Sequence, residues 1–354
     1  MFRVGLDYHQ RRSSICILDV NGKCVKRLSI LGTWIELLAA LKKLREQLMD
    51  PMEICFEASC GYGHLYEQLR TVATRVVVAH PGQLRVIFRS KKKNDRIDAE
   101  KLAKLLFLDA VPQVHVPSVN VRSWRMTIEY RRRLIGKRTK VKNALRSLLR
   151  THGILSPKYL WTGKGLRWLK EQVLPTELDD LRREMLLGEL AEMEKRIKRV
   201  ETVLGRIAHK HPGVALLMTA PGVGIRTAEA VVAYIDQPDR FSSVRKIGAY
   251  FGIVPCQDSS AAVNRLGHIT GDGPGTVRML LCEAAWQGIR RDAHLRQHFE
   301  RICKGDPDRR KIAMVATAHH LLRCLLAMLR TGEAWRHERE PAKGPPGSPL
   351  RKTP

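Results

Sequence analysis

The chain has 354 residues, which is long enough for two domains that each bury their own core. Lys and Arg number 63 against 35 Asp and Glu, so the formal net charge is +28. This excess is too large for an ordinary cytosolic enzyme. A polyanionic partner accounts for it, because phosphates neutralised by Lys and Arg release condensed counterions. The charge therefore predicts nucleic acid as the partner, with a solubilising surface or an anionic membrane as the alternatives.

The cysteines and the apolar segments indicate the cellular compartment of the protein. Its eight cysteines include no Cys-x-x-Cys pair, and three of them (Cys16, Cys55 and Cys282) lie in apolar runs typical of buried thiols. With no signal-peptide pattern at the start, we expect reduced cysteines and a cytoplasmic protein. The apolar segment from His320 to Leu329 is shorter than the ~20 residues of a membrane span, and Arg323 interrupts it. It predicts a core helix, and we expect no membrane partner.

The first hundred residues predict an α/β domain. Three β-rich runs come first, and Asn21-Gly22 between the second and third is a strong hairpin signal. Helices with apolar periodicity then alternate with buried-looking strands. The expected strands are Phe2–Asp7, Ser14–Val20, Cys24–Ile30, Met52–Ala58 and Val76–His80, and the expected helices are Trp34–Leu48, Leu65–Thr71 and Asp95–Leu108.

Two long helices are expected next. Val119–Arg150 carries 11 Arg or Lys and one acid, Glu129, so it predicts a polyanion-binding helix rather than a merely solvated face. Asp179–His209 has apolar residues at alternating steps of four and three, which is a coiled-coil seam. A spacer or self-association helix is one interpretation, and a helix packed on its own domain is the other. The seam residues are Leu186, Leu190, Met193, Ile197, Val200, Leu204 and Ile207.

Four acidic residues lie at the ends of predicted strands or near the start of a predicted helix. Asp7 ends the first strand, Glu57 ends the fourth, and Asp95 and Asp98 lie three apart near a helix start. Asp7 alone could be a turn residue and Asp95 a first-turn acid, but Glu57 lies in an otherwise apolar strand, where a charge needs a partner or a metal. Three segments thus bring four carboxylates to one end of a mixed sheet, the geometry of a ribonuclease-H-like core that uses divalent metal.

A second globular unit is expected from about Pro212 to Arg336. Pro221-Gly222-Val223-Gly224 predicts a turn between helices whose backbone N–H groups can hold phosphate, or else a plain helix–helix turn. A helix is expected over Phe241–Gly252. After it, Ser259 and Ser260 stand in a loop of small residues that is either only a loop or the source of a nucleophile. The residues expected to clamp phosphate near them are Arg265, His268 and Arg278.

Several of these motifs together resemble one known family, the DEDD transposases of bacterial insertion sequences of the IS110 type. The likeness extends over roughly residues 1–336, with the motifs in the family's order. It is carried by Gly5-Leu6-Asp7, Phe56-Glu57-Ala58-Ser59, Lys93-Asn94-Asp95-Arg96-Ile97-Asp98-Ala99, the Pro221 turn and the stretch from Pro255 to Arg278.

The resemblance implies an α/β plus α architecture in three parts. These are a RuvC-like, ribonuclease-H-like domain over residues 1–150, a helical coiled-coil linker over 151–211, and a mainly helical C-terminal transposase domain over 212–336. Residues 337–354 are rich in Pro, Gly and charge, and this composition predicts a disordered tail. It also implies that Asp7, Glu57, Asp95 and Asp98 bind Mg²⁺ or Mn²⁺ and that a serine is the nucleophile. Counting from Pro255 gives Ser260. The family's serine precedes glycine, but Ala261 follows here, so Ser259 remains an alternative.

The implied function is DNA strand breakage and rejoining during transposition, guided by a structured bridge RNA. The expected partners are donor and target DNA, the bridge RNA, and further copies of the chain in a homodimer or homotetramer. The alternatives are a hydrolytic RuvC-like nuclease and a non-enzymatic helix-hairpin-helix DNA-binding protein. The residues expected to contact nucleic acid are Arg89, Lys91, Lys92, Lys93, Arg131, Arg132, Arg133, Lys137, Arg138, Gly222, Gly224, Arg265 and Arg278.

Overall fold

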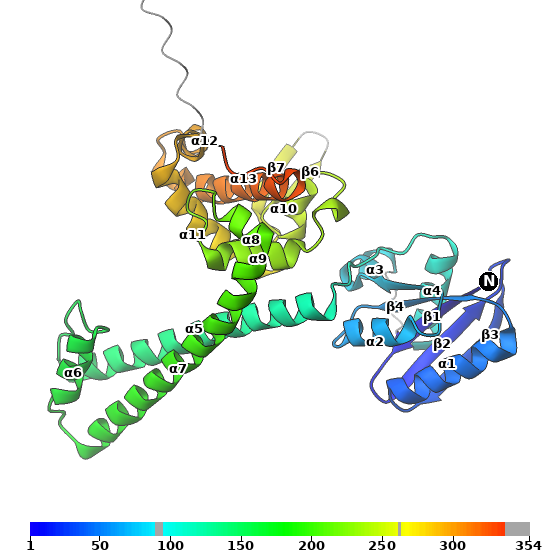
Figure 1. Ribbon diagram of the computed structural model, residues 1–354, viewed down its shortest axis with the longest axis horizontal. Helices are drawn as coiled ribbons and strands as arrows, with labels where there is room; N and C mark the ends of the chain where they lie inside the picture. The colour runs from blue at the N-terminus through cyan, green and yellow to red at the C-terminus, as the bar shows by residue number, and fades with distance from the viewer. Residues whose placement is uncertain (89–94, 261–262, 337–354) are drawn as a thin grey trace, which may run out of the picture. The chain divides into compact units, whose positions relative to one another are not determined.

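A computed structural model of the protein describes residues 1–88, 95–260 and 263–336. They form two compact units, of which the first is Met1–Arg122 and the second begins at Ser123. Figure 1 shows the helices and strands of both. The predicted tail, residues 337–354, lies outside the described residues. So do four of the predicted nucleic-acid contacts, Arg89, Lys91, Lys92 and Lys93.

The first unit is built on a five-stranded mixed sheet with the order β3-β2-β1-β4-β5. β1 pairs antiparallel with β2 and parallel with β4, β2 pairs antiparallel with β3, and β4 pairs parallel with β5. This confirms the predicted ribonuclease-H-like order of elements, including the hairpin at Gly22. The strands are β1 (Phe2–Tyr8), β2 (Arg12–Leu18), β3 (Cys24–Leu31), β4 (Met52–Glu57) and β5 (Arg75–Ala79).

Helices cover both faces of this sheet, because side chains alternate between the faces along each strand. Val4, Leu6 and Phe56 pack with α1 (Trp34–Leu48) and α2 (Tyr62–Leu69) on one face. Cys16, Cys55 and Ala79 face the other side, where they pack with α4 (Asp95–Phe107) and with α3. The sequence did not predict the short helix α3 (Pro81–Ile87), in which Pro81 stands in the first turn and His80 is the N-cap.

Gly5 allows α4 to lie directly on β1. A Cβ at Gly5 would be 1.9 Å from the Ala99 carbonyl oxygen and 2.4 Å from the Ala103 nitrogen, both of them backbone atoms of α4. The two alanines are themselves buried and small. Gly5 and Asp7 are two residues apart on one strand and therefore share a face. The close approach of α4 at Gly5 thus brings the first turn of that helix toward Asp7.

We expect Gly5→Ala to destabilise the first unit by about 1–3 kcal/mol or more, because helix backbone must move to admit the methyl group. The control is Gly136→Ala in α5, where a Cβ would meet nothing within 4 Å. That change should stabilise the protein by roughly 0.5–1 kcal/mol, since alanine is the better helix former. Thermal and denaturant unfolding of both variants measure the difference. Equal stability of the two would contradict the close packing.

Two long helices form an arm of the second unit: α5 (Val119–Thr151), whose first turn belongs to the first unit, and α7 (Glu177–Lys210), with α6 (Gly163–Glu171) between them in the chain. Leu190 of α7 clusters with residues of α5, and Leu204 joins a cluster with Ile128 of α5. Ion pairs join the helices as well, with Arg131 Nη2 lying 2.5 Å from Glu201 Oε1. The buried members of the predicted seam therefore pack within the chain, as in the alternative interpretation, and a coiled coil between chains stays a prediction.

The rest of the second unit is mainly helical. Its core gathers around α13 (Arg310–Thr331), in which Leu321, Leu322, Leu325 and Leu326 are fully buried. Within the described residues, the segment Pro307–Thr331 is the one helix long and apolar enough to cross a membrane, at a mean hydropathy of 1.6. Its burial in this core fits the predicted core helix. The surrounding helices are α8 (Pro212–Leu217), α9 (Ile225–Ile235), α10 (Lys246–Tyr250), α11 (Gly275–Arg291) and α12 (Ala293–Cys303), with short 3-10 turns at Pro238–Arg240 and Pro307–Arg309.

Two local predictions in this unit were wrong. The helix expected over Phe241–Gly252 is reduced to α10, and Gly252 has a positive φ of 61° that ends it. The expected serine loop is a hairpin of β6 (Pro255–Ser260) and β7 (Val263–Ile269). A strand made of small polar residues lacks the alternation of apolar and polar residues by which strands are recognised in a sequence. Such a strand is identified only by its backbone pairing with a neighbouring strand in the structure.

Four histidines gather where α12 packs on α13. His320 lies with its Nε2 atom 2.9 Å from that of His294, and its ring stacks on His298 at 4.4 Å between centroids. Burial, helped by the charges of His298, His294, Arg323 and Arg301, lowers the pKa of His320 to about 4. Burial likewise lowers the pKa of His298 and His319. The fold therefore disfavours the charged form of His320, His298 and His319.

We expect the melting temperature of the protein to fall by several degrees between pH 7.5 and pH 5. An unfolded histidine takes up a proton near pH 6.5, whereas folded His320 resists it down to about pH 4, so stability is fully present above pH 6.5 and is lost as the pH falls through this window. Calorimetry across this pH range measures the effect. His320→Phe should flatten the profile, and an unchanged profile would show that the cluster does not control acid stability.

Candidate active site

The carboxyl ends of two parallel strands place the first two acids of the site. β1 and β4 are paired from Phe2 and Met52 to Leu6 and Phe56, so Asp7 and Glu57 follow at the same edge of the sheet. Both residues lie on the face covered by α4, since the alternate residues Leu6 and Phe56 point to the opposite face. The predicted convergence of these strand ends is therefore present in the fold.

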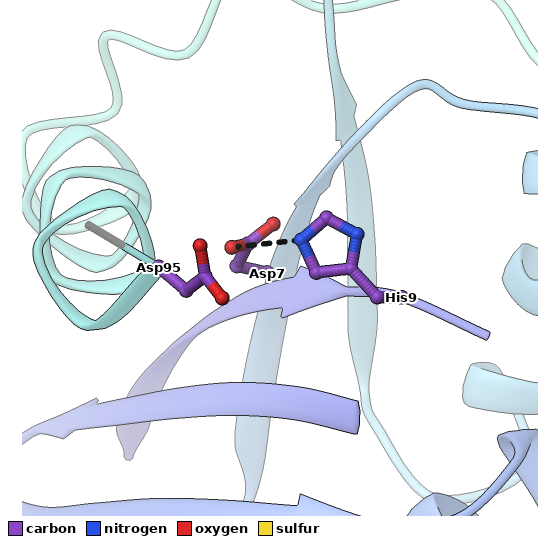
Figure 2. Close-up of side chains that lie close together, drawn as sticks. All are labelled: Asp7, His9 and Asp95. Carbon is purple, nitrogen blue, oxygen red and sulfur yellow. Dashed lines mark ion pairs between the residues drawn. The ribbon is translucent and has the colours of Figure 1, made fainter. Parts of the chain in front are cut away.

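The first turn of α4 supplies the other two acids, Asp95 and Asp98. The ligand atoms of Asp7, Asp95 and His9 all lie within 4.8 Å of one another. Figure 2 shows the three side chains directed toward a common point, Asp95 from the helix and the other two from β1 and the residue after it. Asp98 has a different immediate partner, because its Oδ1 atom accepts a hydrogen bond of 2.9 Å from Lys101 Nζ.

A cavity of about 400 Å³ opens beside these residues. Acids from three segments reach it, namely Asp7, Glu57 and Asp98, together with the cations Arg85 and Lys101. The mixture of signs suits a phosphodiester substrate, since the acids can hold cations while Arg and Lys face the phosphate oxygens.

The electrostatics of Asp7 test whether this site suits a divalent cation. Its side chain is 19% exposed. Burial raises the pKa of Asp7, His9 opposes that change, and Asp95 and Asp98 raise the pKa further by repulsion. Carboxylates held together against their mutual repulsion, with oxygen atoms converging on one point, form a donor set that a hard divalent ion satisfies. The residues present therefore fit such an ion.

Glu57 is exposed, although its apolar neighbours in the sequence suggested that it would be buried. It ends β4 and its residue is exposed, whereas Ile54, Cys55 and Phe56 before it are buried. The burial cost inferred from its apolar neighbours therefore does not apply, because the last residue of the strand leaves the core. Its place on the cavity wall, together with Asp7, is the structural reason to keep it in the site.

The two candidate serines lie in the second unit. Ser259 and Ser260 are the last residues of β6, paired in the register with Asn264 and Val263 of β7, and the structure describes their backbone only. Arg265 on β7 is exposed. Arg278 is used within the fold: its Nη1 atom donates to the carbonyl oxygens of Phe251, at 3.0 Å, and of Asp272. Arg278 is thereby bonded to residues that precede and follow the hairpin in the chain.

Comparison with known proteins now adds to this geometry. A transposase family model of the IS110 DEDD type matches residues 4–154, and a model described as "Transposase IS116/IS110/IS902 family" matches residues 214–300. A Pseudomonas aeruginosa protein, "Probable family 20 transposase", is 28% identical over 345 residues, which cover 94% of this chain and 98% of that protein. The transposase for insertion sequence element IS1111A of Coxiella burnetii is 26% identical over 301 residues, covering 80% of this chain and 81% of that protein.

The chain belongs to the IS110 family of transposases. It is therefore an enzyme that binds DNA and breaks and joins its strands, which sets aside the non-enzymatic alternative. The family's DEDD domain covers the first unit and extends into α5, and that domain implies a divalent metal. Hence the acid-lined cavity of the transposase is the part of the first unit where the metal chemistry is expected.

The predicted nucleic-acid contacts of the transposase fall into two groups in the structure. Arg132, Arg133 and Lys137 are exposed on α5, and Arg132 also pairs with Glu129. Arg131 is ion-paired with Glu201, and Arg138 is half-buried. The exposed members are those free to face phosphate directly, whereas Arg131 also joins α5 to α7.

The Pro221 turn of the transposase has a packing role that its sequence did not reveal. Gly222 has a φ of 80°, and a Cβ there would be 2.3 Å from the Ala284 carbonyl oxygen of α11. The glycine thus allows close helix packing, which the plain-turn interpretation also requires. Gly224, in contrast, begins α9 with open space around it, beside a cavity of about 510 Å³ that Arg291 also lines. Phosphate binding by this turn stays a prediction.

Sequence reasoning missed two residues that line the acid-lined cavity, His9 and Lys101. His9 Nε2 lies 3.4 Å from Asp7 Oδ2. Its position two residues after Asp7 was the available signal, because strand residues i and i+2 share a face. Lys101 stands one turn after Asp98 on α4, so helical spacing could have paired the two.

Proposed function

We propose that this transposase recombines DNA under the guidance of a structured bridge RNA, with Ser260 as the nucleophile and Asp7, Glu57, Asp95 and Asp98 as the ligands of Mg²⁺ or Mn²⁺. The observation that supports the metal half of the proposal is the convergence of carboxylates from β1, β4 and α4 at one cavity. Apolar residues on both faces of the sheet form its core, and these acids lie at the edge of the sheet instead.

The proposed reaction is a transfer of phosphoryl groups between hydroxyls. The Ser260 hydroxyl oxygen attacks the phosphorus, the bond from phosphorus to the 3′ oxygen breaks, and the serine proton ends on the released 3′ hydroxyl. A 3′ hydroxyl of another strand then attacks the phosphoserine, restores the diester and returns the proton to Ser260. A bound divalent ion would stabilise the charge that develops on the attacking and leaving oxygens. Ser259 is the alternative nucleophile.

The carboxylates of the first unit serve this reaction by position. Asp7 and Asp95 would hold the ion through oxygens that already converge, while Lys101 orients Asp98 through their 2.9 Å hydrogen bond. Arg85, on the cavity wall, would bind a phosphate oxygen. Because the acids and the serine belong to different units, the working site would be composite between copies of the chain in a homodimer or homotetramer.

The nucleic acids are proposed to be held mainly by charge. The exposed cations of α5, together with Arg265 and Arg278, would contact backbone phosphates of DNA and RNA. The Gly222 and Gly224 turn would bind a phosphate at the start of α9. Sequence would be read by base pairing of the bridge RNA with donor and target DNA rather than by these side chains.

Self-association would have to use residues outside the α5–α7 contact. Leu178, Leu181 and Met185, near the start of α7, are exposed at 76%, 53% and 63%. They are more exposed than Val203 and Ile207 further along α7, at 38% and 40%, whereas Leu190 and Leu204 are buried against α5 and its neighbours. We propose this end of the arm as the contact between copies.

Reconstituted recombination tests the proposed function. Purified protein, labelled donor and target duplexes and a transcript of the DNA flanking the gene are combined with Mg²⁺ or Mn²⁺. We expect joined product only when the transcript is present, and we expect the preferred target to follow changes in the transcript's loops. Cleavage without joining, whatever the RNA, would instead support the hydrolytic nuclease. Product that forms equally well without RNA would refute guidance while leaving the recombinase in place.

A further inference from the structure

We propose that His9 is a ligand of the same metal ion as Asp7 and Asp95, and that its imidazole directs the site toward Mn²⁺ in preference to Mg²⁺. This inference rests on the proposed metal site and goes beyond the four carboxylates. It assigns a nitrogen ligand to a centre otherwise made of oxygen atoms, with a consequence for ion choice that can be measured apart from DNA cleavage.

The backbone fixes the place of His9. Its amide donates to the Arg12 carbonyl at 3.1 Å, which closes the turn between β1 and β2 directly after the strand that carries Asp7. Asp7 and His9 are two residues apart and share a face, so both side chains point to the side covered by α4. The turn thus presents the imidazole at the mouth of the cavity, which His9 helps to line.

The distances fit a shared ion. Ligand atoms of Asp7, His9 and Asp95 lie within 4.8 Å of one another. Ligands bound at about 2.1 Å on opposite sides of an octahedral ion are about 4.2 Å apart, so a small movement suffices. The His9 side chain is 55% exposed, and a half-exposed ring can make that movement without disturbing the core.

A simple ion pair accounts less well for this arrangement. The distance between His9 Nε2 and Asp7 Oδ2 is 3.4 Å, longer than the roughly 2.7–2.9 Å of a good charge-assisted hydrogen bond. Figure 2 shows the ring facing the Asp7 carboxylate, with the Asp95 carboxylate beside that of Asp7. An ion held among these three groups would contact all of them, because their ligand atoms lie within 4.8 Å of one another.

Ligand chemistry gives the expected ion preference. Mg²⁺ prefers oxygen ligands and near-ideal octahedral geometry, whereas imidazole suits the later divalent metals. Mn²⁺ accepts both oxygen and nitrogen. A centre of carboxylates with one imidazole should therefore bind Mn²⁺ more tightly than Mg²⁺, and removing the imidazole should reduce that difference.

Pulsed electron paramagnetic resonance of Mn²⁺ bound to the full chain tests the proposal directly. The protein is freed of metal with a chelator, titrated with Mn²⁺, and examined for coupling of the ion to ¹⁴N. We expect ¹⁴N coupling in the wild type. In His9→Gln it should vanish, and Mn²⁺ affinity should fall about tenfold while Mg²⁺ affinity changes little. His9→Asp should restore tight Mn²⁺ binding without the coupling.

Two further variants separate the possible outcomes. His209→Gln removes an exposed histidine of α7 and should leave the coupling intact. Asp7→Asn should abolish Mn²⁺ binding in the wild-type affinity range. Mn²⁺ bound through Asp7 without ¹⁴N coupling, or coupling that survives in His9→Gln, would overturn the role of His9 and leave the carboxylate site standing. Mn²⁺ binding that is indifferent to Asp7 would overturn both.

Discussion

Replacing Asp7 by asparagine is expected to lower the rate of DNA strand cleavage by about a thousandfold or more, because the loss of one ligand removes several kcal/mol of charge stabilisation. Asp7 is the acid that Asp95 and His9 both approach, so it contributes to the site from the centre of the cluster. The substitution keeps the shape of the side chain. Cleavage of a labelled duplex at fixed metal concentration gives the rate.

In metal-free protein, Asp7→Asn should not lower the thermal stability, in contrast to its effect on the cleavage rate. Asp7→Asn removes a poorly exposed charge that repels Asp95 and Asp98, so the melting temperature should stay equal or rise. Added Mn²⁺ or Mg²⁺ should raise the melting temperature of the wild type, because binding to the native state stabilises it, and should leave the variant unmoved. A variant that melts lower than the wild type without metal would mean that Asp7 is structural.

Asp50→Asn is the matched control for this experiment. Asp50 is half-exposed and pairs only loosely with the amino group of Met1, at 3.3 Å. The change has the same chemistry and the same loss of charge as Asp7→Asn, away from the cavity. Cleavage and the metal-induced rise in melting temperature should both be unchanged. Loss of activity in both variants would show that net charge, rather than ligation, accounts for the effect.

Ser260→Ala should abolish strand exchange and the covalent protein–DNA adduct together, with a loss in rate of about a thousandfold or more, as for other enzymes that lose a nucleophile. The adjacent Ser259→Ala is the matched control, since both serines are in β6 and lose the same hydroxyl. Denaturing gels of protein trapped on a labelled substrate detect the adduct. The wild type and Ser259→Ala should form it.

The pattern of the two serine variants decides between the mechanisms that remain. Loss of the adduct in Ser259→Ala alone would assign the nucleophile to Ser259. Hydrolytic cleavage at the wild-type rate in both variants would remove serine from the mechanism and leave the metal-dependent nuclease. The Asp7 result is independent of this choice, because both mechanisms need the carboxylates.

The order of strands and helices in the first unit could be predicted from the sequence, because apolar runs and helical periodicity are local and regular patterns. The apolar strand runs and helical periods of residues 2–108 matched β1 to β5, α1, α2 and α4, and Asn21-Gly22 marked a hairpin that the structure confirms. The helix α3 was missed, since its seven residues give too short a period to recognise. In the second unit, the hairpin that contains Ser260 was missed because its strands are polar. They are recognised only by the pairing of β6 with β7 in the structure.

The sequence by itself determined the chemistry available to this protein: the basic charge, the four acids at element ends, and the order of strands and helices that brings them together. Each of these depends on residue type and on spacing along the chain. Only the tertiary structure decided which side chains converge. Gly5 admits α4 to within contact of β1, so Asp95 meets Asp7, and the β1–β2 turn adds His9 to them. It also decided that α7 packs on α5 and that Arg131 and Arg278 are bound within the fold. Packing between distant segments sets these contacts, and spacing within one segment does not encode them.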